Sequence, residues 1–237
     1  MKPLFTFLLS LVSLTGFSQQ VDLVTPLQNS LIETSGLMLL DNRLITHNDS
    51  GGAAALFEID STSGGIARTV VIENAPNVDW EDLCHDDTYI YIADFGNNAG
   101  SRTNLRVYRV LISDYLNTPN DTISADTISF DYADQTDFTP SSFSTNYDAE
   151  AIISLDNNLY IFTKNWGDMW TIIFALPKIP GNYSIPRIDS IDVEGFITGA
   201  SFNTSSNSVM LSGYAFTYPF IVAVSYTHLT LPTSTHG

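Results

Sequence analysis

The stretch from Val78 to His85 reads VDWEDLCH, and its pattern of acidic or small residues followed by an apolar run occurs in three further places. The other openings are ETSGLMLL from Glu33, YDAEAIIS from Tyr147 and ITGASFNT from Ile197. After each opening the chain turns at Asp, Asn or Ser residues, returns as a second apolar segment, and continues into a third segment rich in aromatic and β-branched residues. Such repeats predict small antiparallel sheets that cover one another's faces, which is the architecture of a β-propeller.

The spacing of the repeats sets the number of blades. Leu37, Leu83, Ile152 and Ala200 occupy matching places and are separated by 46, 69 and 48 residues. A four-stranded blade needs about 40–50 residues, so the middle interval carries an insertion, with predicted loops at 119–122 and 136–144. We therefore expect an all-β fold in which residues 19–224 form about four four-stranded blades of an incomplete propeller, most simply one of the six-bladed type.

The alternation of apolar residues also predicts the individual strands. No segment of ten or more residues shows helical periodicity. The expected strands are 37–39, 44–45, 55–59 and 67–72 in the first blade; 88–94, 105–111 and 125–132 in the second, after its opening; 152–155, 159–163, 170–176 and 188–196 in the third; and 201–203, 209–214 and 220–224 in the fourth.

Both ends of the chain are predicted to lie outside this domain. Lys2, the apolar run from Leu4 to Leu14 and the small-residue exit before Gln19 are typical of a secretory signal peptide at residues 1–18, so we expect a secreted or cell-surface protein. The segment 225–237, SYTHLTLPTSTHG, does not continue the blade pattern and resembles a translated adapter read-through. We interpret it as a non-native tail, which implies a truncated propeller; a Thr-rich linker is the alternative.

Charge and cysteine content limit the partners. Without Lys2 the chain has 8 basic and 26 acidic residues, a net charge of −18. This charge disfavours nucleic acid and anionic membrane surfaces and favours cations or basic surfaces. No stretch after the signal peptide is long enough for membrane insertion. Cys84 is the only cysteine, so it has no intramolecular disulfide partner, and we expect it to be a packed core residue.

Six strings in order carry a resemblance to a known group. They are THNDSGG, VDWEDL, YIYIADFGNNAGSR, LRVYRV, YDAEAI and LYIFTKNW, between residues 46 and 166. They resemble a group of secreted bacterial β-propeller proteins, many of which carry a type IX secretion sorting domain that this chain lacks. More distantly, the blade openings are similar to those of SdiA-regulated, NHL-type, phytase-esterase-like and gluconolactonase-type propellers. The resemblance implies export and a propeller fold, and among the distant relatives it implies calcium on the central axis.

Two sets of polar residues should converge at one end of the channel, because they recur at matching places in successive blades. The first set stands at the blade openings and the second at the ends of the second strands. From both sets we predict a calcium site at Asp49, Glu81, Asp94 and Glu150, with Asn97 as a carbonyl donor, because calcium prefers oxygen ligands. The alternative is that these side chains cap strands and tie blades together through backbone N–H groups.

The same residues suggest a weaker catalytic hypothesis. His47 beside Asp49 would act as a base, Lys164 would stabilise a developing anion, and Glu81 with Glu150 would form an acid–base pair. No nucleophile elbow, zinc-binding helix motif or phosphate loop is present. The only cofactor that the sequence suggests is therefore the calcium ion.

Three functions remain open at this stage. The favoured one is a binding or interaction module for a protein, glycan or small molecule. The runner-up is a metal-dependent hydrolase of lactonase, phosphotriesterase or phytase-like type, and the third is a structural repeat domain of a larger surface protein. An open ring would also expose apolar blade faces, so we expect poor solubility of the chain as written.

Overall fold

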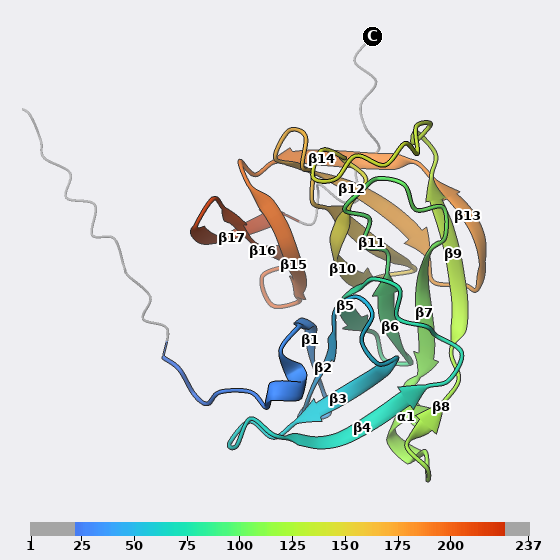
Figure 1. Ribbon diagram of the computed structural model, residues 1–237, viewed down its shortest axis with the longest axis vertical. Coiled ribbons are helices and arrows are strands. Elements are labelled where there is room, and N and C mark those ends of the chain that lie inside the picture. Colours follow the sequence, from blue (N-terminus) through green and yellow to red (C-terminus); the bar gives the residue numbers. More distant parts are fainter. Residues whose placement is uncertain (1–21, 226–237) are drawn as a thin grey trace, which may run out of the picture.

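A computed structural model of the protein describes residues 22–225. The predicted signal peptide and all but the first residue of the predicted tail lie outside these residues. The described chain forms four β-sheets arranged around a central axis as a four-bladed β-propeller (Figure 1). This arrangement confirms the all-β propeller fold that the repeats predict.

The blades follow one another in chain order, and each runs outward from the axis. Blade 1 contains β1 (Thr34–Leu40), β2 (Arg43–Asn48), β3 (Ala55–Ile59) and β4 (Ile66–Ile72). Blade 2 contains β5 (Trp80–His85), β6 (Tyr89–Asp94), β7 (Leu105–Leu111) and β9 (Asp126–Tyr132). Blade 3 contains β10 (Ala149–Leu155), β11 (Asn158–Thr163), β12 (Trp170–Pro177) and β14 (Arg187–Asp192). Blade 4 contains β15 (Phe196–Asn203), β16 (Ser208–Ala215) and β17 (Tyr218–Ser225).

Turn chemistry explains where the hairpins lie. Asp41 and Asn42 both adopt positive φ, 47° and 61°, which is the geometry of the tight turn that suits the twist of paired strands. The predicted strand 188–196 is wrong at its end, because β14 stops at Asp192 and Phe196 already begins the inner strand of blade 4. Glu194, at φ 49°, lies in the bend that separates the two strands.

Two short strands link neighbouring blades and were not predicted. β8 (Thr122–Ile123) lies in the insertion of blade 2 but pairs in parallel with β4 of blade 1. β13 (Gly181–Ile185) leaves blade 3 and pairs in parallel with β9 of blade 2. The predicted loop at 119–122 therefore ends in a strand. Short helices, η1 (Asn29–Leu31) and α1 (Ile112–Asn117), complete the elements that the structure describes.

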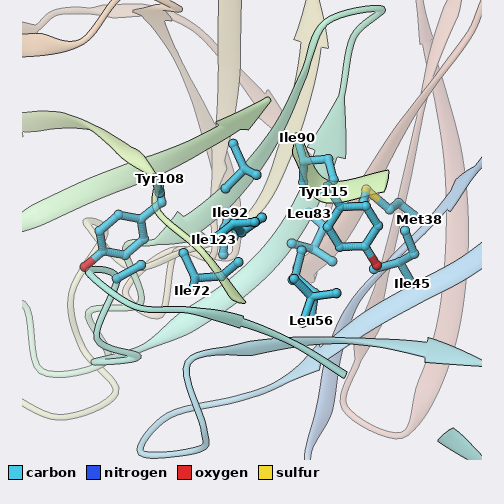
Figure 2. Close-up of a cluster of buried hydrophobic side chains, with 14 of the residues drawn as sticks. Met38, Ile45, Leu56, Ile72, Leu83, Ile90, Ile92, Tyr108, Tyr115 and Ile123 are labelled. Carbon is cyan, nitrogen blue, oxygen red and sulfur yellow. The ribbon is translucent and has the colours of Figure 1, made fainter. Parts of the chain in front are cut away.

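Apolar clusters between the blades hold the fold together. Figure 2 shows the cluster between blades 1 and 2, which contains Ile45 and Leu56 of blade 1 and Leu83, Ile92 and Tyr108 of blade 2. Equivalent clusters separate blades 2 and 3 and blades 3 and 4. Burial of each such side chain contributes about 1.5–3 kcal/mol, so contacts between blades contribute strongly to the stability of the ring.

The ring is open between blades 4 and 1 (Figure 1). Leu37 of β1 is 56% exposed, whereas its equivalent Leu83 in β5 is 3% exposed because blade 1 covers it. Leu37 and Leu83 also line a cavity of about 420 Å³ in the channel, together with Ile152 and Ala200 from the other two blades. The inner strands of all four blades thus line this cavity. Among residues 22–225 no helix is long and apolar enough to cross a membrane.

Candidate cation site at the mouth of the central channel

Each inner strand carries a β-bulge at the same place near its start. The register shifts lie between Thr34 and Leu37, Trp80 and Asp82, Ala149 and Ala151, and Ile197 and Gly199. A bulge adds one residue to a strand and redirects its side chain. The residues at the bulges are Ser35, Glu81, Glu150 and Thr198, and we call the end of the channel where they lie the mouth.

Hydrogen bonds between blades 1 and 2 fix the mouth near Glu81. Ser35 donates its hydroxyl to the backbone carbonyl of Glu81 at 2.6 Å. The Asn77 side chain donates to the carbonyls of Asn48 and Asp49 at 3.0 and 2.9 Å, and its own oxygen accepts from Trp80 N–H. These bonds join the start of β5 to the end of β2.

The result is a cluster of three carboxylates from two blades, Asp49, Asp79 and Glu81, which we call the acidic triad. One oxygen of each lies within 4.8 Å of the other two. Gly96 leaves room for it, because a Cβ there would overlap Oε1 of Glu81 and Oδ2 of Asp79. A larger residue at this position of the Phe95–Arg102 loop would therefore displace the carboxylates of Glu81 and Asp79.

Glu81 differs from every other buried carboxylate at the mouth. It is 6% exposed, yet among residues 22–225 its carboxylate accepts no hydrogen bond and pairs with no cationic side chain. Burying an uncompensated carboxylate is costly, and in apo protein the cost is met by taking up a proton. Burial raises the pKa of Glu81, and the charges of Glu150 and Asp49 raise it further.

The negative charge of Asp94, by contrast, is balanced by two arginine side chains. Its oxygens pair with Arg102 at 3.0 Å and Arg106 at 3.3 Å, and it also accepts from Asp79 N–H. Asn97 is engaged as well, since its amide nitrogen donates to the Tyr147 carbonyl and its oxygen accepts from Arg102 N–H. The two predicted ligands therefore hold loops and strands in place, as the capping alternative anticipates.

Glu150 stands at the matching bulge of blade 3, and the ammonium group of Lys164 balances its charge. Lys164 forms a short ion pair with Glu150 and lies over the ring of Trp166, 4.6 Å from its centroid. Trp166 in turn donates its indole N–H to Asp148 at 2.7 Å. Burial raises the pKa of Glu150, and Lys164 opposes that shift.

Burial is also the main cause of the pKa shifts of Asp79 and His47 near the mouth. Burial raises the pKa of Asp79 to about 6, with the charge of Asp49 as the next contribution. Burial lowers the pKa of His47 to about 4, so its imidazole is neutral at physiological pH. His47 Nδ1 bonds to the Asn48 carbonyl at 2.8 Å, and its ring meets Trp80 edge-on. His47 therefore packs against Trp80 in the interface between blades 1 and 2, and its Nε2 is buried without a hydrogen-bond partner among residues 22–225. A catalytic role for His47 stays a prediction.

The structure thus divides the predicted calcium ligands. It brings Asp49 and Glu81 together, and it places Asp94, Asn97 and Glu150 with partners of their own. The sequence reasoning missed Asp79, which stands in the bend just before β5, two residues ahead of Glu81.

Comparisons with known proteins give only distant similarities to two solved structures. No family model matches the chain, and no curated protein matches it. Among solved structures it is similar to the hydrazine synthase of Kuenenia stuttgartiensis, with 13% identity and a TM-score of 0.43 over 89% of this chain and 49% of that one. It is also similar to a chain of a mitotic checkpoint complex, with 11% identity and a TM-score of 0.42 over 83% of this chain and 63% of that one. The chain spans less than two thirds of either protein.

Proposed function

We propose that the protein is an exported β-propeller binding module that holds a hard divalent cation, calcium in the first instance, within the acidic triad. The observation that carries this proposal is the burial of Glu81 without a basic side chain to balance its charge. Asp94 and Glu150, by comparison, pair with Arg102 and Lys164. Export rests on the signal-peptide pattern of residues 1–18, and the similarity to secreted bacterial propellers supports it.

The donor set fits such an ion. Asp49, Asp79 and Glu81 offer only carboxylate oxygens, the ligands that calcium prefers. Calcium takes six to eight oxygen ligands, and three carboxylates supply between three and six of them. The coordination positions left over would be filled by water or by oxygens of a bound partner, which gives the mouth a way to recognise one.

Calcium should raise the thermal stability of the full-length protein. A ligand that binds only the native state at 100 times its Kd adds about 2.7 kcal/mol, which corresponds to a rise in Tm of roughly 5–10 °C for a domain of this size. The measurement is a melting curve at increasing CaCl2, with NaCl at matched ionic strength as the control, because screening alone stabilises so acidic a chain. A calcium response no larger than that of NaCl would refute the cation proposal.

Calcium binding should also release a proton. Because the pKa of Glu81 is raised by burial, the apo protein keeps this carboxyl protonated at pH 7, and the ion must displace that proton. Affinity should accordingly rise with pH. Titration calorimetry in two buffers of different ionisation enthalpy measures the effect, and we expect about one proton released per ion at pH 7. Identical heats in both buffers would contradict this assignment of Glu81.

A further inference from the structure

The exposed aromatic side chains of residues 22–225 all lie at the mouth end of the propeller. Phe143 is 63% exposed and Trp170 is 40% exposed, and the other two, Phe216 and Tyr218, lie at the turn from β16 to β17. Phe143 follows the end of β9 and Trp170 begins β12, and antiparallel pairing places both of these strand ends at the mouth. The other exposed large apolar side chains are aliphatic. Exposed aromatic rings gathered at one end of a molecule are typical of a binding surface.

Two of these aromatic residues belong to loops that are joined to each other. The Asn146 side chain, in the loop of Phe143, donates to Asp168 at 2.7 Å, and Asp168 also accepts from Trp170 N–H at 3.0 Å. The ring of Phe143 meets that of Trp166 edge-on, with the centroids 4.8 Å apart. Phe143, Trp166 and Trp170 therefore form one surface, which we call the aromatic face.

The backbone of the aromatic face is strained. Phe143 has a φ of 57°, in the left-handed region that Gly, Asn and Asp adopt most readily. Met169, immediately before Trp170, has a φ of 62°. At Phe143 the strain comes together with a ring that is exposed to water, and both lower the stability of the free protein. Strained residues gather at binding sites, where a partner that covers the ring offsets the loss.

Carboxylates without a basic partner surround Trp170. Asp168 lies two residues before it, Asp192 stands opposite it in the pair of β12 and β14, and Glu194 lies in the bend that follows β14. All three are exposed, and within residues 22–225 none of them forms an ion pair. The aromatic face is therefore bordered by negative charge that a cationic ligand could balance.

The chain already holds one cation by this chemistry. The ammonium group of Lys164 pairs with Glu150 and lies over the ring of Trp166, 4.6 Å from its centroid. Ammonium and guanidinium groups bind in this way because both the carboxylate and the face of the ring attract positive charge. Phe143 and Trp170 offer the same combination, and no basic side chain of residues 22–225 lies over either ring.

We propose that the aromatic face binds a basic peptide segment of a partner protein, with lysine or arginine side chains against Phe143 and Trp170. The net charge of −17 attracts such a segment and repels nucleic acid and acidic peptides. Charge complementarity of this kind gives a fast association that salt weakens. The inference rests on the proposed binding function and names its partner class, but it requires no ion in the acidic triad.

Fluorescence anisotropy of a labelled peptide of alternating lysine and glycine residues, titrated with the full chain, tests the proposal. We expect binding that weakens as NaCl is added and that is roughly tenfold tighter, or more, than binding of the matching glutamate–glycine peptide. A neutral oligosaccharide, cellopentaose, should not displace the lysine peptide. All titrations contain EDTA, so the calcium melting curve tests the acidic triad separately, and either proposal can fail alone.

Matched variants distinguish the aromatic face from general attraction to an acidic protein. Phe143→Asn should weaken peptide binding about three- to tenfold, and the protein should stay folded because asparagine tolerates the positive φ. Its control is Ile179→Asn, the same substitution at a side chain that is 67% exposed at the opposite end of the blades. Glu194→Gln should weaken binding about two- to fivefold, whereas Asp87→Asn removes a charge from an exposed turn at the opposite end and should have little effect.

Three results would overturn the proposal. They are no binding of the lysine peptide at low salt, displacement of that peptide by cellopentaose, and equal effects of the aromatic-face variants and their controls. Melting curves establish that each variant is folded. If Phe143→Asn does not fold, the comparison of Glu194→Gln with Asp87→Asn decides the matter by the same criterion.

Discussion

Replacing Asp94 with asparagine should lower the free energy of unfolding by about 3 kcal/mol. The Asp94 carboxylate is completely buried and compensates two guanidinium groups, those of Arg102 and Arg106. Removing its charge leaves both partly buried cations without their main partner, which costs far more than the loss of one neutral hydrogen bond. Because Asp94 also accepts from Asp79 N–H, the change should loosen the start of β5.

Urea denaturation of Asp94→Asn and wild type, with EDTA present, measures this effect without any contribution from divalent ions. The control is Asp126→Asn, which breaks an ion pair with Arg109 in which the carboxylate is largely exposed. Exposed pairs contribute about 0–1 kcal/mol, so this variant should unfold almost like wild type. Equal losses in the two variants would show that Asp94 does not organise the mouth.

The fold could be predicted from the sequence because each blade repeats its own local signals. Leu37, Leu83, Ile152 and Ala200 were aligned by pattern alone, and they do occupy the same position next to the bulge in each blade. The hairpin at Asp41 could also be predicted from the sequence, because Asp and Asn favour the positive φ that its turn requires.

The parts of the fold that escaped prediction depend on contacts distant in sequence. β8 has two residues, and β13 follows a complete strand of blade 3; each pairs with the outer strand of the preceding blade, a contact that local pattern does not reveal. The end of β14 was misjudged for a related reason. Apolar residues recur past the end of β14, at Val193 and Phe196, and only the bend at Glu194 separates the two blades.

The location of the candidate site could be predicted from the sequence, but the residues that form it could not. Pattern matching indicated which carboxylates reach the mouth, but it gave no information on which of them have cations nearby. In the structure, Arg102 pairs with Asp94 and Lys164 pairs with Glu150, whereas no basic side chain among residues 22–225 pairs with Glu81. Asp79 joins through Asn77 and Gly96, whose roles are visible only in the folded chain.

Replacing Glu81 with glutamine should stabilise the cation-free protein at pH 7, by about 1–3 kcal/mol. The pKa of Glu81 is raised in the folded state by burial and by neighbouring carboxylates, so the folded state holds a proton that the unfolded chain releases. Below the ordinary pKa of a glutamate, near 4.3, both states hold the proton and this difference in protonation is absent. As pH rises above that value, the difference lowers the stability of the folded state by a growing amount. Glutamine removes the mismatch while keeping the size of the side chain.

Two conditions and one control make this prediction sharp. The advantage of Glu81→Gln over wild type should be small at pH 4 and increase towards pH 7 in EDTA, and added calcium should reverse it by stabilising wild type alone. Glu150→Gln is the same substitution at the equivalent bulge of the next blade, but it leaves Lys164 without its partner, so it should destabilise. If both variants lost stability to the same extent at pH 7, Glu81 would be an ordinary structural carboxylate and the acidic triad would have no need of an ion.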